Sequence, residues 1–166
     1  DEWLARMPLT GEDVIRRVEN TLVELKEKWT SRGATTSINV DSAAADNKLY
    51  PLNIGHAFPT GFNVNEIAAH DSFNPCDSSR PPHALQKSDL CKLDYGIHVN
   101  GHLVDCAFSF SWDDRHNGLL TAVAAATNTA IRECGPDARL TEVGALIQEV
   151  MESGEVFAPF GRGKVY

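Results

Sequence analysis

The chain has 166 residues, of which 42% are hydrophobic and 23% charged, as in an ordinary globular protein, and its length fits one domain or a piece of one. Its net charge of -8 argues against nucleic acid as a partner, because phosphates attract clustered Lys and Arg. No stretch approaches the ~20 apolar residues that cross a bilayer, and the first residues do not form a signal-peptide pattern. We therefore expect neither nucleic acid nor a membrane as a partner.

Four cysteines, Cys76, Cys91, Cys106 and Cys134, are spread along the chain without a C-x-x-C pair. This spacing argues against a thiolate zinc site. A chain of this length can also bury a core without disulfides. The pattern predicts thiols in a reducing compartment, and hence a cytoplasmic protein.

The first predicted element is a helix over residues 13–29. Its apolar residues recur at spacings of 3 and 4 and form one stripe, Val14, Val18, Leu22, Leu25 and Trp29. Thr10 with Asp13 resembles a capping box, with Asp in place of the usual Glu. Gly33 lies shortly after the expected end of the helix.

Short strands and loops are predicted between the first helix and residue 89. A strand is expected near residues 35–40, followed by a loop. Residues 53–70 resemble short strands broken by a turn at Pro59-Thr60-Gly61. Residues 71–89 contain three prolines and are expected to form a long surface loop.

The strongest β signal covers residues 90–112, and two helices are predicted after it. The apolar spacing over residues 119–131 predicts a helix that stops at Gly135-Pro136. A third helix is expected to begin with Thr141 as its cap and to end at Gly154.

Asn100-Gly101 separates two alternating runs and predicts a β-hairpin, because both residues accept a positive φ in a type I′ turn. With a two-residue loop, the numbers of paired residues sum to 201. One face is then apolar and is expected to pack on helices: Leu93, Tyr95, Ile97, Val99, His102, Val104, Cys106, Phe108 and Phe110. The other face opens on a cavity or on water: Lys92, Asp94, Gly96, His98, Leu103, Asp105, Ala107 and Ser109.

Asp94 and Asp105 fall on the second face as diagonal neighbours, with Cβ atoms up to ~7–8 Å apart. Both carboxylates then reach one cation, and the small residues Gly96 and Ala107 leave room for it. Two carboxylates so close repel each other unless a cation binds or one is protonated. A three-residue loop would instead place them on opposite faces, and two ordinary solvated aspartates remain the alternative interpretation.

Six segments, in order and with sensible gaps, resemble the type 2 methionine aminopeptidases. They are Ala57-Phe58-Pro59-Thr60-Gly61, Ala68-Ala69-His70, Cys91-Lys92-Leu93-Asp94-Tyr95-Gly96, Asp105-Cys106-Ala107-Phe108, Ala125-Ala126-Thr127-Asn128-Thr129 and Ile147-Gln148-Glu149-Val150-Met151-Glu152-Ser153. The resemblance covers roughly residues 53–153 and, more weakly, the first helix.

The resemblance implies an α/β (α+β) protein with the pita-bread fold of creatinase and the aminopeptidases, an antiparallel β core flanked by helices. Residues 1–166 would form a single, partial catalytic domain, mainly the first half of that fold. The implied activity is removal of the initiator methionine from peptides and nascent proteins. The implied cofactors are two divalent metal ions, Co, Mn, Fe or Zn, and the ribosome is a further expected partner.

The resemblance also implies roles for single residues. Asp94 and Asp105 match the family's first two metal ligands, and His70 matches the catalytic histidine that contacts the substrate and reacts with the family's epoxide inhibitors. Phe58 and Phe160 match aromatic residues of the methionine pocket. The remaining histidines are expected to be structural or exposed, although His98 shares the face of Asp94: His56, His83, His98, His102 and His116.

The chain departs from the family in its later part. The family's other ligands, one His and two Glu, have no match, and residues between Ala158 and Pro159 are missing relative to the family, including one metal-binding Glu. A fragment, a chain with deletions, or the ordered residues of a longer chain would each explain this.

Two other functions are compatible with such a chain. One is that of a non-catalytic relative that binds ribosomes or other proteins. The other is that of a different pita-bread enzyme such as an Xaa-Pro peptidase or creatinase, against which the Phe-Pro-Thr-Gly and Ala-Ala-His matches speak.

Overall fold

The computed structural model of the chain describes residues 9–33, 35–37, 49–72, 79, 83–158 and 161–164. The chain divides into two compact units. The first consists of Asp1–Gln86 and Cys91–Phe108, and the second of Lys87–Leu90 and Ser109–Tyr166. Every described residue that the sequence predicts for the metal and substrate site belongs to the first unit.

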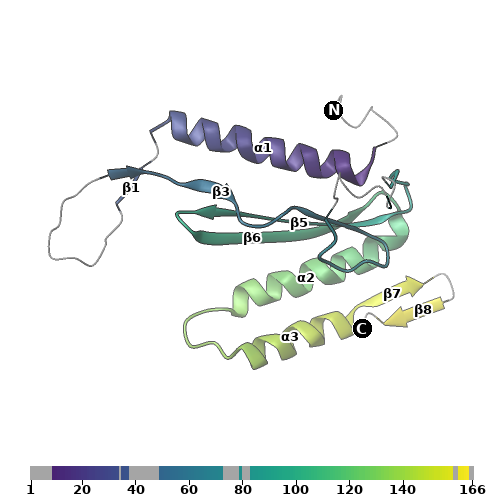
Figure 1. The fold of residues 1–166 in the computed structure, drawn as a ribbon. Helices are drawn as coiled ribbons and strands as arrows, with labels where there is room; N and C mark the ends of the chain where they lie inside the picture. The colour runs from purple at the N-terminus through teal and green to yellow at the C-terminus, as the bar shows by residue number, and fades with distance from the viewer. Residues whose placement is uncertain are drawn as a thin grey trace. The chain divides into compact units, whose positions relative to one another are not determined.

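Helix α1 (Gly11–Ser31) opens the described part of the first unit (Figure 1). The predicted capping box is confirmed: the Thr10 hydroxyl accepts a hydrogen bond from the Asp13 amide, and the Thr10 amide donates to the Asp13 carboxylate at 2.8 Å. That backbone hydrogen bond lowers the pKa of Asp13. Gly33 follows the helix with a φ of +67°, a conformation that glycine adopts without steric cost.

Only the beginning of α1 is buried. Val14 and its neighbour Ile15 are in the core, and α1 contacts the strands described next. The far end of the predicted apolar stripe is open, because Leu25 and Trp29 are 44% and 53% exposed. The periodicity therefore predicts the helix correctly, but two of the five stripe residues are exposed in the described part of the chain.

Four strands form the sheet of the first unit. Strands β3 (Ile54–His56) and β4 (Gly61–Val64) both pair antiparallel with β5 (Leu90–Val99), and β5 also pairs with β6 (His102–Ser111). Because β6 occupies one edge of β5, β3 and β4 follow each other along the opposite edge. A separate small ribbon joins β1 (Thr35–Ser37) to β2 (Leu49–Pro51), and residues 38–40 of the first predicted strand lie outside the described part.

The predicted turn at Pro59-Thr60-Gly61 is instead a bulge in one sheet edge. His56 pairs with Ile97 and Gly61 with Asp94, so the four residues 57–60 face only the two residues 95–96. The Ala57 amide still donates to the Gly96 carbonyl at 3.0 Å. The extra residues must leave the plane of the sheet, and such bulges redirect side chains.

The hairpin turn has the predicted two residues. Asn100 and Gly101 have φ values of +53° and +85°, as a type I′ turn requires. The Asn100 side chain also accepts a hydrogen bond from the Asn53 amide at 2.9 Å, which attaches the turn to the segment before β3. The side-chain contact of Tyr95 with Cys106, which raises the pKa of Tyr95, agrees with a register in which these two residues face each other.

The apolar face of the hairpin is covered on one strand only. On β5, Cys91 and Leu93 are buried. On β6, residues 102–108 are all exposed, including Val104 and Phe108 of the face that was expected to pack on helices. Leu93 is therefore buried as expected, whereas the β6 residues of the same face are exposed.

The predicted surface loop at 71–89 is described only in part, since residues 73–78 and 80–82 lie outside the described residues. Its last part contacts the chain just before α1: the Leu85 amide donates to the Leu9 carbonyl at 2.8 Å, and the Leu85 side chain is buried.

The second unit contains α2 (Asn117–Glu133) and α3 (Leu140–Ser153), which pack against each other (Figure 1). Both helices were predicted, but the expected Thr141 cap is wrong. Arg139 occupies the N-cap position of α3 and makes no side-chain cap hydrogen bond. A hairpin of β7 (Glu155–Ala158) and β8 (Gly161–Lys164) follows. None of the described helices is both long and apolar enough to span a membrane.

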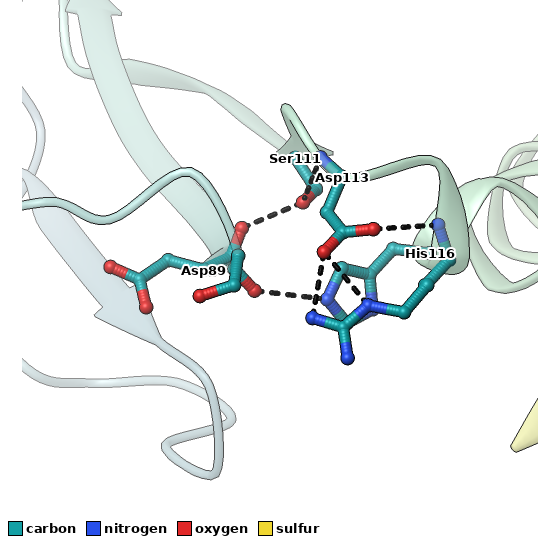
Figure 2. Close-up of polar contacts among 6 residues, drawn as sticks. Asp89, Ser111, Asp113 and His116 are labelled. Carbon is teal, nitrogen blue, oxygen red and sulfur yellow. Dashed lines mark hydrogen bonds and ion pairs between the residues drawn. The ribbon is translucent and has the colours of Figure 1, made fainter. Parts of the chain in front are cut away.

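A polar network links the segment before β5 to the start of the short 3₁₀ helix η1 (Asp114–His116) (Figure 2). The Ser111 hydroxyl donates to the Asp89 carbonyl at 2.7 Å, and the Asp113 carboxylate accepts from the Arg115 amide and guanidinium. His116 contacts the Ser88 carbonyl through Nε2 at 3.1 Å. The network connects the segment before β5 with the end of β6 and the residues that follow it, ahead of α2.

Candidate metal centre

Asp94 lies in β5 opposite Gly61 of β4. A Cβ at Gly61 would sit 3.5 Å from the Asp94 Cβ, so the small residue keeps the space beside the carboxylate open. The Asp94 Oδ1 atom is buried and has no hydrogen-bond partner among the described residues. A buried oxygen without a partner costs about 1–3 kcal/mol, more when it is charged. A hard divalent cation bound to this oxygen would satisfy it.

Asp105 lies in β6 and is exposed. With the two-residue turn, Asp94 and Asp105 share the face opposite the Tyr95–Cys106 contact, as the sequence predicts. The described residues contain no group of three or more His, Cys, Asp or Glu side chains that could hold a metal ion. Two carboxylates on one face could contribute to the ligand set of a divalent cation, but they do not complete one.

Phe58 reaches the aspartate face because of the bulge. A Cβ at Gly96 would lie 2.3 Å from Cε1 of Phe58, so the ring covers Gly96 directly. Gly96 is two residues from Asp94 along β5 and therefore points to the same face. The structure thus brings Phe58 and Asp94 to one face, while Phe160 lies outside the described residues.

His70 ends the segment that follows β4. Its side chain is exposed, and its backbone has a φ of +64°. A non-glycine residue with positive φ is uncommon and is enriched at functional sites. The next residue, Asp71, is hydrogen-bonded to β4 through both its amide and its carbonyl.

His98 shares the face of Asp94, but its contacts are local. Its Nε2 lies 2.8 Å from where a Cβ at Gly55 would be, and its Nδ1 accepts from the Gly101 amide at 3.4 Å. This agrees with the structural role expected for it. His56, His83 and His102 are exposed, also as expected.

Sequence reasoning missed two residues near this face, Asn63 and Thr60, and it placed Lys92 on the face without giving it a role. Asn63 is buried and accepts from the Asp71 amide, and Thr60 is buried with a hydroxyl that has no partner among the described residues. Lys92 donates to the Asn65 carbonyl at 2.6 Å, and burial lowers its pKa. A polar residue at an interior position of β4 was the only available signal for Asn63, and it does not reveal the partner.

The sequence profile of metallopeptidase family M24 matches residues 12–165. The chain belongs to metallopeptidase family M24. Methionine aminopeptidase 2 of Clavispora lusitaniae is 48% identical over 147 residues, which are 88% of this chain and 33% of that protein. Methionine aminopeptidase 2 of Dictyostelium discoideum is 50% identical over 105 residues, 63% of this chain and 23% of that protein. Methionine aminopeptidase 2-2 of Neosartorya fischeri is 52% identical over 102 residues, 61% of this chain and 21% of that protein.

The match confirms the predicted pita-bread fold and the resemblance to type 2 methionine aminopeptidases, and it implies divalent metal cofactors. The chain spans about a fifth to a third of the length of these curated relatives.

Proposed function

We propose that this chain is part of a metal-dependent aminopeptidase that removes the initiator methionine from peptides and nascent proteins. The observation that carries the proposal is the Asp94 carboxylate, whose Oδ1 is buried without a partner among the described residues, on a face that also receives Phe58. A cation would satisfy this oxygen, and an apolar side chain next to it would accept an apolar group of a substrate.

Asp94 and Asp105 would supply two of the ligands for two divalent ions, with Co, Mn, Fe and Zn as candidates. The resemblance assigns the remaining ligands, one His and two Glu, to segments that this sequence does not contain. Bound divalent ions lower the pKa of water and polarise a carbonyl, which is the chemistry needed to cleave a peptide bond.

The residues of the chain would bind and orient the substrate. Phe58, and Phe160 by resemblance, would receive the methionine side chain. The exposed imidazole of His70 would hold the peptide by a hydrogen bond and stabilise charge that develops on its carbonyl oxygen. The substrate would be a peptide or nascent chain that begins with methionine, in the cytoplasm and near the ribosome.

The alternative of a non-catalytic, ribosome-binding relative is not favoured. Both aspartates are present, and the similar curated proteins are named methionine aminopeptidase 2. Those names also argue against an Xaa-Pro peptidase or creatinase.

Turnover and metal content, measured together in the full-length protein, test the proposal. We expect His70→Asn to lower turnover by about 100-fold or more while metal content stays near normal, because His70 contacts the substrate and is not a ligand. Asp94→Asn should lower both, because it removes a ligand. Near-normal turnover in His70→Asn, or loss of its metal, would refute the assigned role.

A further inference from the structure

We infer that Asn63 is a positioning residue that fixes the backbone of His70 and so aims its imidazole. The inference rests on the proposed function, in which His70 contacts the substrate. Asn63 has no part in the chemistry itself. Its contribution is made through the segment that connects β4 to His70.

Asn63 is almost completely buried, with 1% of its surface exposed, in the middle of β4. Its Oδ1 accepts a hydrogen bond from the Asp71 amide at 2.9 Å. A buried amide side chain must find partners, and this one finds a backbone group eight residues further along the chain. The residue that follows His70 is thereby tied to β4.

A second hydrogen bond acts on the same residue. The Phe62 amide donates to the Asp71 carbonyl at 3.0 Å. The amide and the carbonyl of Asp71 are therefore both held by consecutive residues of β4, one through a backbone group and one through the Asn63 side chain. This arrangement restricts both the position and the rotation of the peptide units beside His70.

The restriction matters because His70 has a φ of +64°. A residue with a Cβ avoids this left-handed region, and it stays there only when its surroundings over-determine the conformation. Without the Asn63 acceptor, only the hydrogen bond from the Phe62 amide would hold Asp71, and the backbone of His70 could relax toward negative φ. The imidazole would then leave its present direction.

The opposite end of the segment is attached to the same pair of strands. Lys92, which faces Asn63 in the pairing of β4 and β5, donates from Nζ to the Asn65 carbonyl at 2.6 Å. The Ile67 amide donates to the Val64 carbonyl at 3.2 Å. The segment that ends in His70 is thus fixed at its beginning by Lys92 and at its end by Asn63.

Asn63 also connects this segment to the aspartate face. The position of a Cβ at Gly61 would be 3.6 Å from Asn63 Nδ2 and 3.5 Å from Asp94 Cβ, so both side chains border the same small space. The β4–β5 pair therefore carries Asp94 and also sets the backbone of His70. A fixed geometry between a metal ligand and a substrate-contacting group is what positioning requires.

The test compares Asn63→Leu, which has a similar shape but no acceptor, with Asn63→Asp, which keeps an oxygen in reach of the Asp71 amide. Asn63→Ala serves in place of the leucine variant if the latter does not fold. Asn20→Leu, at an exposed position of α1, is the matched control for the change of residue type.

Two measurements on the metal-free 166-residue chain test the inference. Hydrogen exchange of the Asp71 amide reports the backbone hydrogen bond. Acylation of His70 by diethyl pyrocarbonate, located by mass spectrometry, reports the surroundings of its imidazole. We expect Asn63→Leu to speed exchange at Asp71 about tenfold, as for one lost hydrogen bond. The acylation rate of His70 should change, while Asn63→Asp and Asn20→Leu should keep both rates near those of the parent chain. Unchanged exchange and acylation in a folded Asn63→Leu or Asn63→Ala would overturn the inference.

Turnover in the full-length protein separates this inference from the proposed function. Asn63→Leu should lower turnover about 10- to 100-fold at unchanged metal content, with recovery in Asn63→Asp. If the Asp71 and His70 rates change as expected but turnover does not, positioning by Asn63 stands and the substrate role of His70 fails.

Discussion

The two strands of the β5–β6 hairpin have similar alternating sequences but different surroundings. On β5, the residues of the apolar face next to β4 are buried, and Asp94 has a buried oxygen. On β6, residues 102–108 are exposed on both faces, Asp105 among them. Strand β5 has partners on both edges and α1 packs on the strands beside it, whereas β6 pairs with β5 alone in the described part of the chain.

The difference shows that the alternation of side chains along a strand and the burial of its faces are separate properties. Alternation decides which side chains share a face, and it follows from backbone geometry within one strand. The burial of a face depends on the elements that pack on it. These elements are far away in the sequence, and no local pattern specifies them. The two aspartates can therefore share a face and still differ in their exposure to water.

The largest expected effect is a difference in stability between replacing a leucine on β5 and replacing a leucine on β6. Leu93→Ala should lower the free energy of unfolding by about 2–5 kcal/mol, because Leu93 is only 5% exposed and its loss leaves a cavity. Leu103→Ala should change it by less than about 0.5 kcal/mol, because Leu103 is 67% exposed. Urea unfolding of both variants provides the measurement, and equal costs would contradict the contrast between β5 and β6.

A smaller effect is expected where Phe58 covers β5. Gly96→Ala would place a Cβ 2.3 Å from the Phe58 ring, so the ring must shift. We expect a loss of about 1–3 kcal/mol of stability and, in the full-length protein, a higher KM for peptides that begin with methionine. Gly144→Ala is the control: nothing lies near its Cβ position within α3, so a gain of up to about 1 kcal/mol is expected there. An unchanged KM in Gly96→Ala would argue against Phe58 as a wall of the pocket.

The smallest effect is expected beyond the end of β6, where Asp113 is partly exposed to solvent. The hydrogen bonds from Arg115 lower the pKa of Asp113 to about 2 from 3.8. A lowered pKa means that the contribution to stability is present above pH 3.8 and is lost as the pH falls through about 2. Asp113→Asn should therefore be slightly less stable than the parent chain at pH 7, and the two should converge near pH 2. A pH-independent difference would rule out this charge as its cause.

The sequence predicted much of this fold because its signals are local. The Thr10–Asp13 capping box and the Asn100-Gly101 turn each need only a few neighbouring residues, and both are present in the structure. The bulge at residues 57–60 was predicted as a turn, because proline and glycine mark a break in a strand without specifying its partner. The bulge follows from pairing with β5, a segment some 35 residues away.

The candidate site shows the same limit. Alternation together with the two-residue turn at Asn100-Gly101 placed Asp94 and Asp105 on one face, and the resemblance supplied their expected role. Asn63 was missed because its importance lies in one hydrogen bond to the Asp71 amide, which depends on the path of the segment through His70. A buried polar residue is informative only once its partner is known.

Manganese titration of the 166-residue chain, followed by NMR, tests the central claim that Asp94 and Asp105 together form a cation site. Paramagnetic Mn²⁺ should first broaden the amide signals of these two residues and of Gly96 and Ala107. Binding should be weak and peptidase activity slight or lacking, because ligand number strongly affects affinity. Asp94→Asn should abolish the selective broadening. Broadening that begins at other acidic residues, or that persists in Asp94→Asn, would contradict the claim.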